Sequence, residues 1–184
     1  MKKRNWFILC AMLAAVAVYV RSAGTEAGLQ TVTQLEISRY LGRWYEIARY
    51  PNRFEKQCDR DVIATYGLRE DGRISVLNTC VKADGSHSEA KGWAKISDPS
   101  TNAKLKVTFF WPFFGNYWVL ELGQNYEYAL IGEPGRKYLW ILSRTPHMSA
   151  EQYQTITKNL AAKGYDAAKL VRVKQTAGAK IVAN

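Results

Sequence analysis

Gly42-Arg43-Trp44 stands at the head of a strand-like run over residues 43–50 and constrains the fold more than any other feature of the chain. Alone the motif is weak, because Gly-x-Trp often arises by chance. It has a partner far downstream, however, in a second strand-like run over 138–144 that ends in Arg144. A Trp that begins a first strand and an Arg that ends a last one predict a barrel closed at that end. The Arg144 guanidinium is then expected to lie on the Trp44 ring as a cation–π pair.

Short strand-like runs separated by turn signals occupy most of the chain, which is typical of an all-β protein. Tight turns are expected at Asp71-Gly72, Asp84-Gly85, Asp98-Pro99 and 133–135. Eight strands are enough to close a barrel that holds one small ligand. The runs predict strands at 43–50, 60–68, 73–81, 88–97, 103–110, 117–122, 126–132 and 138–144.

The period of the apolar residues changes after Pro146, and this change predicts one helix. Ser149 can cap its start, with Gln152 completing a capping box. Tyr153, Ile156 and Leu160 then share one apolar face, and Gly164 ends the helix. A helix with a single apolar face docks most simply on the outside of the barrel. Residues 170–174 read as a ninth strand.

The first 24 residues are expected to be a signal peptide, since four residues with three positive charges precede an apolar run over 6–20. An uncleaved N-terminal anchor is the less favoured alternative. Cys10 is not expected to be a lipidation site, because Leu9 is too large for the preceding position. We therefore expect an exported protein, periplasmic or associated with the outer membrane, with a barrel domain over 25–175 and a loose tail over 176–184.

The charge of the mature chain excludes little. The formal net charge is +10, and the leader holds four basic and no acidic residues, which leaves 22 basic against 16 acidic residues, or +6. No basic stripe or nucleic-acid motif is present, so no nucleic-acid partner is expected. Two cysteines remain after the leader, Cys58 and Cys80, and an even count in an exported chain suggests one disulfide.

Three segments together make the chain resemble the lipocalin family, in the branch of the bacterial outer-membrane lipocalins and apolipoprotein D. They are Tyr40–Arg49, Ala64–Leu68 and Tyr138–Pro146. In the family's second motif an Asp precedes a Tyr by three residues, and here Tyr126 is kept while Gly123 replaces the Asp. The resemblance implies an eight-stranded up-and-down barrel with a C-terminal helix. It also implies binding of a fatty acid or lysophospholipid, with no cofactor, in the service of membrane lipid maintenance.

Alternation along each strand predicts which side chains line the barrel. Because Trp44 faces inward, Glu46, Ala48 and Tyr50 should do so too. Tyr66, Phe109 and Trp140 match ligand-contacting positions of the family, whereas Gly42, Trp44 and Arg144 are expected to close the base. The residues expected to bind the ligand are Glu46, Tyr66, Asn78, Val107, Phe109, Tyr117, Val119, Tyr138 and Trp140.

Up-and-down connectivity places Cys58 and Cys80 near the open end, or mouth, opposite Trp44. A two-residue turn at Asp71-Gly72 pairs Cys80 with Ile63 rather than with Cys58. A bulge or a folded-back loop must therefore supply the difference if the disulfide forms.

The run Phe109–Phe114 is unusual for a hairpin tip, because loops in water rarely expose so many aromatic rings. Trp111, Phe113 and Phe114 fit three alternatives. They fold inward over the cavity, they contact a membrane as a peripheral surface, or they form a homodimer interface.

An enzyme is the alternative class, in the form of a lipid-modifying enzyme that uses the same cavity. The mature chain has only two histidines, His87 and His147, and no spacing typical of a triad or a metal site. A haem carrier is disfavoured because neither histidine falls on an inward strand position. Glu46 and Glu121 are the acids expected to face inward, and Glu46 is better explained as a polar contact for a head group.

Overall fold

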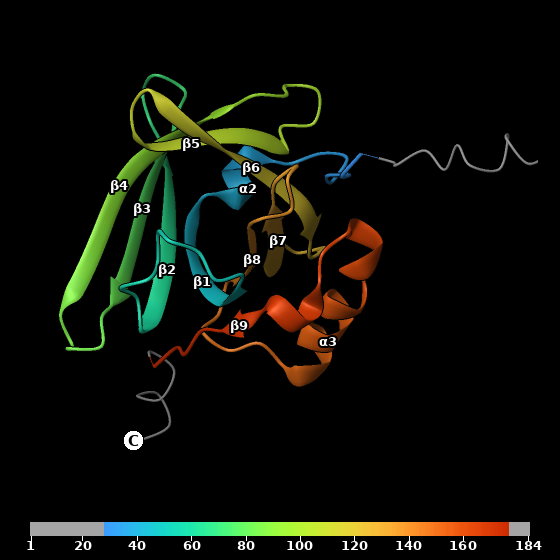
Figure 1. Ribbon diagram of the computed structural model, residues 1–184. Helices are drawn as coiled ribbons and strands as arrows, with labels where there is room; N and C mark the ends of the chain where they lie inside the picture. Colours follow the sequence, from blue (N-terminus) through green and yellow to red (C-terminus); the bar gives the residue numbers. More distant parts are fainter. Residues whose placement is uncertain (1–27, 177–184) are drawn as a thin grey trace, which may run out of the picture.

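Eight antiparallel strands close into a barrel, and a short ninth strand adds beside the first (Figure 1). The computed structural model describes residues 28–176, so the expected signal peptide, Cys10 and residues 177–184 lie outside the described part. β1 closes the barrel by pairing with both β2 and β8. The strands are β1 (Gly42–Arg49), β2 (Arg60–Leu68), β3 (Ile74–Val81), β4 (His87–Ile96), β5 (Lys104–Phe110), β6 (Phe113–Leu122), β7 (Tyr128–Gly132), β8 (Leu139–Ser143) and β9 (Val171–Arg172).

All eight predicted strands are present, and only two of their boundaries differ from the prediction by more than one residue. β6 begins at Phe113 rather than at residue 117, because Phe110 pairs with Phe113 across a two-residue turn. β7 begins at Tyr128 rather than at 126, because Tyr126 takes a φ of 61° and belongs to the turn. The turn at Asp71-Gly72 forms as predicted, and Gly72 supplies the positive φ of 78° that it requires.

β1 contains a bulge that the simple alternation did not predict. Its register with β8 shifts between Glu46 and Ala48, and from there on β1 pairs with β9 instead of β2. Glu46 faces the interior, but Ala48 and Tyr50 pack outside the barrel wall. The prediction that Ala48 and Tyr50 face inward was therefore wrong, because one extra residue reverses the alternation.

The C-terminal segment fills the gap that opens between β1 and β2. Val173 N donates to Ile47 O at 2.9 Å, and Asp61 N donates to Lys174 O at 2.8 Å. Gln175 Nε2 bridges the two strands by donating to Glu46 O and Val62 O. Thr176, the first residue of the tail that was expected to be loose, is held to β2, because its Oγ1 donates to the Asp61 carboxylate.

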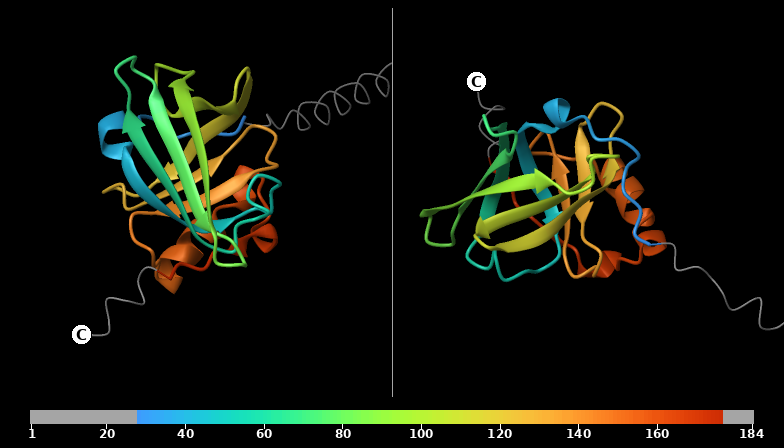
Figure 2. Two further views of the ribbon diagram at one scale, coloured as in Figure 1. Left: turned by 90° about the vertical axis from the view of Figure 1, so that its left-hand side faces the viewer. Right: turned by 90° about the horizontal axis from the view of Figure 1, so that it is seen from above.

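Two apolar clusters lie on the two sides of the barrel wall. The inner cluster surrounds the fully buried Trp44. The outer cluster joins the wall to helix α3 (Ala150–Lys158), which lies outside the barrel on the side away from β3 and β4 (Figures 1 and 2). Ser149 caps α3 by accepting from Gln152 N at 3.1 Å, and Ile156 and Leu160 are fully buried, as predicted.

Candidate ligand-binding cavity

The barrel encloses a cavity of about 110 Å³ between the base and the mouth. Most of its lining is aliphatic or aromatic, and every strand except β9 contributes to the lining or to the inner cluster beneath it. The lining residues are Tyr40, Glu46, Glu55, Val62, Ile63, Ala64, Tyr66, Ile74, Val76, Asn78, Ala94, Leu105, Val107, Phe109, Tyr117, Ile131, Trp140 and Leu142.

Seven of the nine residues expected to bind the ligand line this cavity: Glu46, Tyr66, Asn78, Val107, Phe109, Tyr117 and Trp140. Val119 does not, because it is fully buried in the inner cluster. Tyr138 does not line it either. The Tyr138 ring stacks on the Trp140 ring with 5.8 Å between centroids, and Phe54, from the loop after β1, packs on Tyr138.

The lining contains residues that the sequence reading missed. Ile74, Val76 and Ala64 share the alternation of Asn78 and Tyr66, so the pattern could have found them. Glu55 comes from the loop after β1, and loop residues carry no periodic signal.

The base is closed as the Gly-x-Trp motif predicts. The Arg144 guanidinium lies 3.8 Å from the centroid of the Trp44 ring. Arg144 Nη1 also donates to the carbonyls of Leu41 and Arg43, both at 2.9 Å. Gly42 has a φ of +90°, and a Cβ there would lie 3.5 Å from Arg144 Nη1. These contacts tie the start of β1 to the end of β8.

Three tyrosine hydroxyls form a chain on the base side of the cavity. Tyr117 Oη lies 2.6 Å from Tyr40 Oη and 3.0 Å from Tyr66 Oη. Burial raises the pKa of Tyr66 to about 12 and raises the pKa values of Tyr40 and Tyr117 well above the usual range. All three phenols are therefore neutral near pH 7 and act as hydrogen-bonding groups.

Asn78 adds a polar atom to the wall of the cavity. Its Oδ1 is buried and has no hydrogen-bond partner within residues 28–176. A buried acceptor without a partner is costly, so it favours a ligand that can donate a hydrogen bond there.

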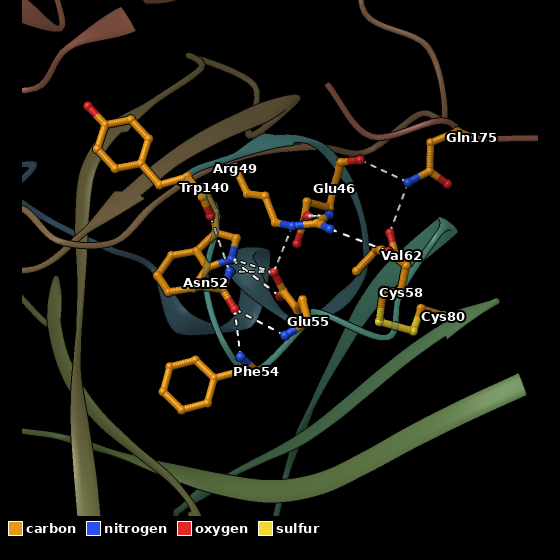
Figure 3. A network of polar contacts seen from close by, with 11 residues as sticks. Glu46, Arg49, Asn52, Phe54, Glu55, Cys58, Val62, Cys80, Trp140 and Gln175 are labelled. Atoms are coloured by element: carbon orange, nitrogen blue, oxygen red, sulfur yellow. Dashed lines mark hydrogen bonds and ion pairs between the residues drawn. A yellow bond between two sulfur atoms is a disulfide. The ribbon is translucent and has the colours of Figure 1, made fainter. Parts of the chain in front are cut away.

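A cluster of charged residues lies at the mouth side of the cavity (Figure 3). Arg49 Nη1 contacts Glu46 Oε1 at 2.8 Å, and Arg49 Nε contacts Glu55 Oε2 at 3.3 Å. Trp140 Nε1 donates to the Glu55 carboxylate at 3.3 and 3.4 Å. The bulge in β1 makes this cluster, because it brings Arg49 to the same side as Glu46.

Glu46 is the most deeply buried acid of the cluster, with a side chain only 4% exposed. Burial raises its pKa well above the usual range, and the nearby Glu55 carboxylate raises it further. Arg49 opposes both effects. Glu121, the other acid expected to face inward, does not: it accepts from Tyr128 Oη and pairs with Lys163 on the outer side. A second bulge, between Val119 and Glu121, accounts for this difference.

Cys58 and Cys80 form the predicted disulfide, with Cα atoms 5.6 Å apart. The required offset comes from a bulge in β2 between Arg60 and Ile63, where Asp61 takes a φ of 53°. The bond anchors the end of the loop over 51–57. At the start of this loop, Tyr50 Oη donates to Asp166 O at 2.8 Å.

The aromatic run forms the hairpin between β5 and β6 and does not fold over the cavity. Phe110, Trp111 and Phe113 are 75%, 72% and 71% exposed. Phe114 differs from them, because it packs edge-on against Trp93 at 5.2 Å. The inward-folding alternative therefore does not hold for the tip, although Phe109 reaches the lining.

The turn that departs from the family motif is intact. Gly123 N donates to Tyr128 O, and Tyr126 N donates to Gly123 O. The Glu127 carboxylate fills the space beside Gly123, since a Cβ there would lie 2.3 Å from it, and it accepts from Asn125 N at 2.9 Å. Glu127 thus supplies a carboxylate at the turn where position 123 has none.

Metal ligands do not gather anywhere in residues 28–176: no group of three His, Cys, Asp or Glu side chains there is placed to hold a metal ion. Neither His87 nor His147 lines the cavity. None of the helices in this range has the length and apolar character needed to span a bilayer.

A closed eight-stranded barrel around an apolar cavity, with an outer helix and an Arg–Trp pair at its base, defines a small-ligand-binding barrel. The family model for a lipocalin-like domain matches residues 35–175. The chain therefore belongs to the lipocalin family, and the match extends over most of the chain.

Curated relatives come from several kingdoms. Temperature-induced lipocalin-1 of Arabidopsis thaliana is 44% identical over 156 residues, covering 80% of this chain and 83% of the relative. Outer membrane lipoprotein Blc of Escherichia coli K12 is 41% identical over 170 residues, covering 91% and 96%. Apolipoprotein D of Mus musculus is 37% identical over 151 residues, covering 76% and 77%.

Solved structures agree on the fold. Insecticyanin from the tobacco hornworm Manduca sexta superposes with a TM-score of 0.64 at 25% identity, covering 82% of this chain and 86% of that one.

Proposed function

We propose that this protein carries or stores a single-chain amphiphile, a fatty acid or a lysophospholipid, inside the barrel and so serves membrane lipid maintenance. The observation that carries the proposal is the distribution of polarity in the cavity. Its walls are apolar, and charged groups gather only at the mouth side. An acyl chain fits such walls, with its head group at the charged end.

Burial of the acyl chain supplies the affinity. Each buried CH₂ contributes about 0.8 kcal/mol, so a long chain supports micromolar binding or better. The cavity volume of 110 Å³ is less than the roughly 150 Å³ that takes up one benzene in an apolar protein cavity. A long chain therefore requires the mouth to open.

Tryptophan fluorescence titrated with palmitate and with lysophosphatidylcholine tests the proposal. We expect saturation near one ligand per barrel. Ala64→Phe fills the cavity and should weaken binding, whereas Thr65→Phe, on the next residue of β2 and outside the lining, should not. A flat titration with every such lipid, or equal effects of the two variants, contradicts the proposal.

The cavity favours a carrier over the lipid-modifying enzyme. The described residues that line it include no serine, cysteine, histidine or lysine, so a serine or cysteine nucleophile activated by a histidine base has no starting groups there. Incubation of the pure protein with lysophosphatidylcholine should release no fatty acid. Steady release, lost in Glu46→Gln, supports the enzyme instead.

We also propose that the exposed hairpin of Phe110, Trp111 and Phe113 contacts an anionic membrane surface when lipid is exchanged. The hairpin lies at the mouth, and Lys106 on β5 adds positive charge. Aromatic rings suit the boundary between head groups and acyl chains. The net charge of +6 that is expected for the chain without residues 1–24 adds an attraction that salt screens beyond about 10 Å at 0.1 M.

Vesicle sedimentation with Trp111→Ser/Phe113→Ser tests this contact. The double variant should bind vesicles of anionic lipid less and pick up lipid more slowly, with unchanged affinity for dispersed lipid. Leu68→Ser is the matched control, because Leu68 is 65% exposed at the opposite end of the barrel. If the double variant instead abolishes self-association and leaves vesicle binding intact, the hairpin is a homodimer interface.

A location in the cell envelope, periplasmic or at the outer membrane, accords with the proposed function. The E. coli relative carries the name outer membrane lipoprotein, and the chain begins with an expected signal peptide. Fractionation of cells that express the full chain tests the location, and recovery in the cytosol contradicts it.

A further inference from the structure

The carboxylate of Glu55 occupies a complete carboxylate-binding site at the mouth side of the cavity. Arg49 Nε lies 3.3 Å from Glu55 Oε2, and Asn52 Nδ2 donates to the same oxygen at 2.7 Å. Trp140 Nε1 donates to both oxygens (Figure 3). A cation and two N–H donors around one carboxylate are the contacts that a bound fatty acid head group requires.

Glu55 reaches this site from a loop, whereas its main partners stand on the barrel. Arg49 belongs to β1 and Trp140 to β8. Glu55 follows Asn52, whose Oδ1 accepts from the backbone N–H groups of Phe54 and Glu55. Glu55 also lines the cavity, so its side chain stands between the cavity and the loop.

We propose that Arg49 and Trp140 form the head-group site for an anionic single-chain amphiphile, and that Glu55 is an internal carboxylate which the head group displaces. This inference rests on the proposed lipid-binding function and deepens it. It names the ligand class, a single acyl chain with a carboxylate or phosphate, and it makes the loop over 51–57 a lid that such a ligand opens.

The exchange is balanced in charge and in hydrogen bonds. Arg49 is 14% exposed and faces two acids, Glu46 and Glu55, so its charge needs a buried partner. An incoming carboxylate or phosphate replaces the charge of Glu55 and accepts from the same Arg49 and Trp140 donors. An uncharged head group cannot do this, because it would leave Arg49 short of one partner.

The loop has the anchors that a lid requires. The Cys58–Cys80 bond holds its end, and the hydrogen bond from Tyr50 to Asp166 holds its start. Between these points the loop is held to the barrel through Glu55 and through Phe54, which lies 5.6 Å from the ring of Tyr138. Release of Glu55 therefore frees the segment without unfolding its ends. It also enlarges a cavity of 110 Å³ that is too small for a long chain.

Calorimetric titration with three probes of equal chain length tests the inference: dodecanoate, dodecyl phosphate and dodecanol. Glu55→Gln removes the competing charge and should bind both anions about tenfold more tightly than the wild type, with less than about a twofold change for dodecanol. Arg49→Met should weaken binding of the anions about tenfold and leave dodecanol nearly unchanged. Glu89→Gln is the matched control, because Glu89 is 57% exposed on β4 and makes the same charge change.

The outcomes separate the inference from the function on which it rests. If no protein binds any of the three probes, the lipid-binding function fails. If all bind but Glu55→Gln leaves the ratio of anion to alcohol affinity unchanged, the displacement by a head group is refuted. Preference for dodecanoate over dodecyl phosphate, or the reverse, identifies which anion the site takes.

Hydrogen exchange gives a second readout that does not depend on a folded Arg49 variant. Dodecanoate should speed exchange of the amides of Phe54, Glu55 and Cys58 in the wild type at least about fivefold, because their hydrogen bonds lie within the lid. Dodecanol also has to open the mouth to enter, but it does not replace Glu55 on Arg49, so it should speed this exchange markedly less than dodecanoate does. Equal protection with both probes overturns the opening of the lid.

Discussion

Arg144→Ala tests the closure of the barrel base most directly. Arg144 lies on the Trp44 ring at 3.8 Å and donates to the carbonyls of Leu41 and Arg43 at 2.9 Å. It also donates to Arg39 O, near the end of the single-turn helix α2 (Ile37–Tyr40). The variant removes all of these contacts at once and leaves the carbonyls with water as their only new partner.

The expected loss of stability follows from these contacts. The cation–π contact contributes about 1 kcal/mol at a partly exposed site. The carbonyl contacts of a charged donor contribute about 1 kcal/mol each at this exposure, which is below the range for buried ones. The free energy of unfolding should therefore fall by about 4 kcal/mol, or roughly 8–16 °C in melting temperature for a domain of this size.

Thermal and urea unfolding of the oxidised protein measure this loss. Arg43→Ala is the matched control, since Arg43 is exposed and carries the same charge, and it should shift stability by no more than about 0.5 kcal/mol. Arg144→Lys keeps the cation and loses the planar fork, so it should fall between the two. If Arg144→Ala unfolds within error of Arg43→Ala, other contacts close the base and the reasoning is wrong.

Two further predictions concern acids whose surroundings the structure defines. Burial raises the folded-state pKa of Glu46 above its unfolded value of about 4.3. The protonated carboxyl therefore contributes its full stabilisation below about pH 4.3, and this stabilisation is lost as pH rises through the folded-state pKa. Urea unfolding between pH 4 and pH 8 should show this decline in the wild type and a shallower one in Glu46→Gln; equal slopes contradict it. Gly123→Asp should lower the free energy of unfolding by about 1 kcal/mol, because its Cβ meets the Glu127 carboxylate. Adding Glu127→Ala should recover most of that loss, because the carboxylate introduced at position 123 then accepts the hydrogen bond from Asn125 N. Simple additivity of the two melting-temperature shifts refutes this exchange of carboxylates.

Local signals predicted most of the fold. Turn chemistry at Gly72 and the cap at Ser149 act within a few residues, so the sequence alone shows them. The Trp44–Arg144 pair is long-range, but its two partners stand at recognisable ends of strands. Alternation, together with the family resemblance for Tyr66, Phe109 and Trp140, then placed seven of nine expected ligand contacts on the lining.

The errors arose where strands depart from regular pairing. Ala48, Tyr50 and Glu121 were all assigned to the barrel interior by strict alternation along a strand, and each lies beyond a bulge. A bulge depends on how a strand pairs with neighbours far away in the chain, so no short window of sequence reveals it. The aromatic hairpin tip could not be placed from the sequence either, because the same run of aromatic residues is compatible with an exposed tip and with one folded over the cavity.

The same irregularities account for the polar mouth of an otherwise apolar cavity. In a regular β1, Arg49 would face away from Glu46, and a buried acid would have no cation beside it. The bulge turns Arg49 to the side of Glu46, and the pairing of β1 passes from β2 to β9 at this point. The offset in β2 at Arg60–Ile63 lets Cys58 reach Cys80, which fixes the loop that delivers Glu55 to Arg49. The proposed head-group site is therefore a product of two irregularities in the sheet. A variant that restores regular pairing in β1 should lose the proposed preference for anionic over uncharged single-chain ligands before it loses the barrel fold.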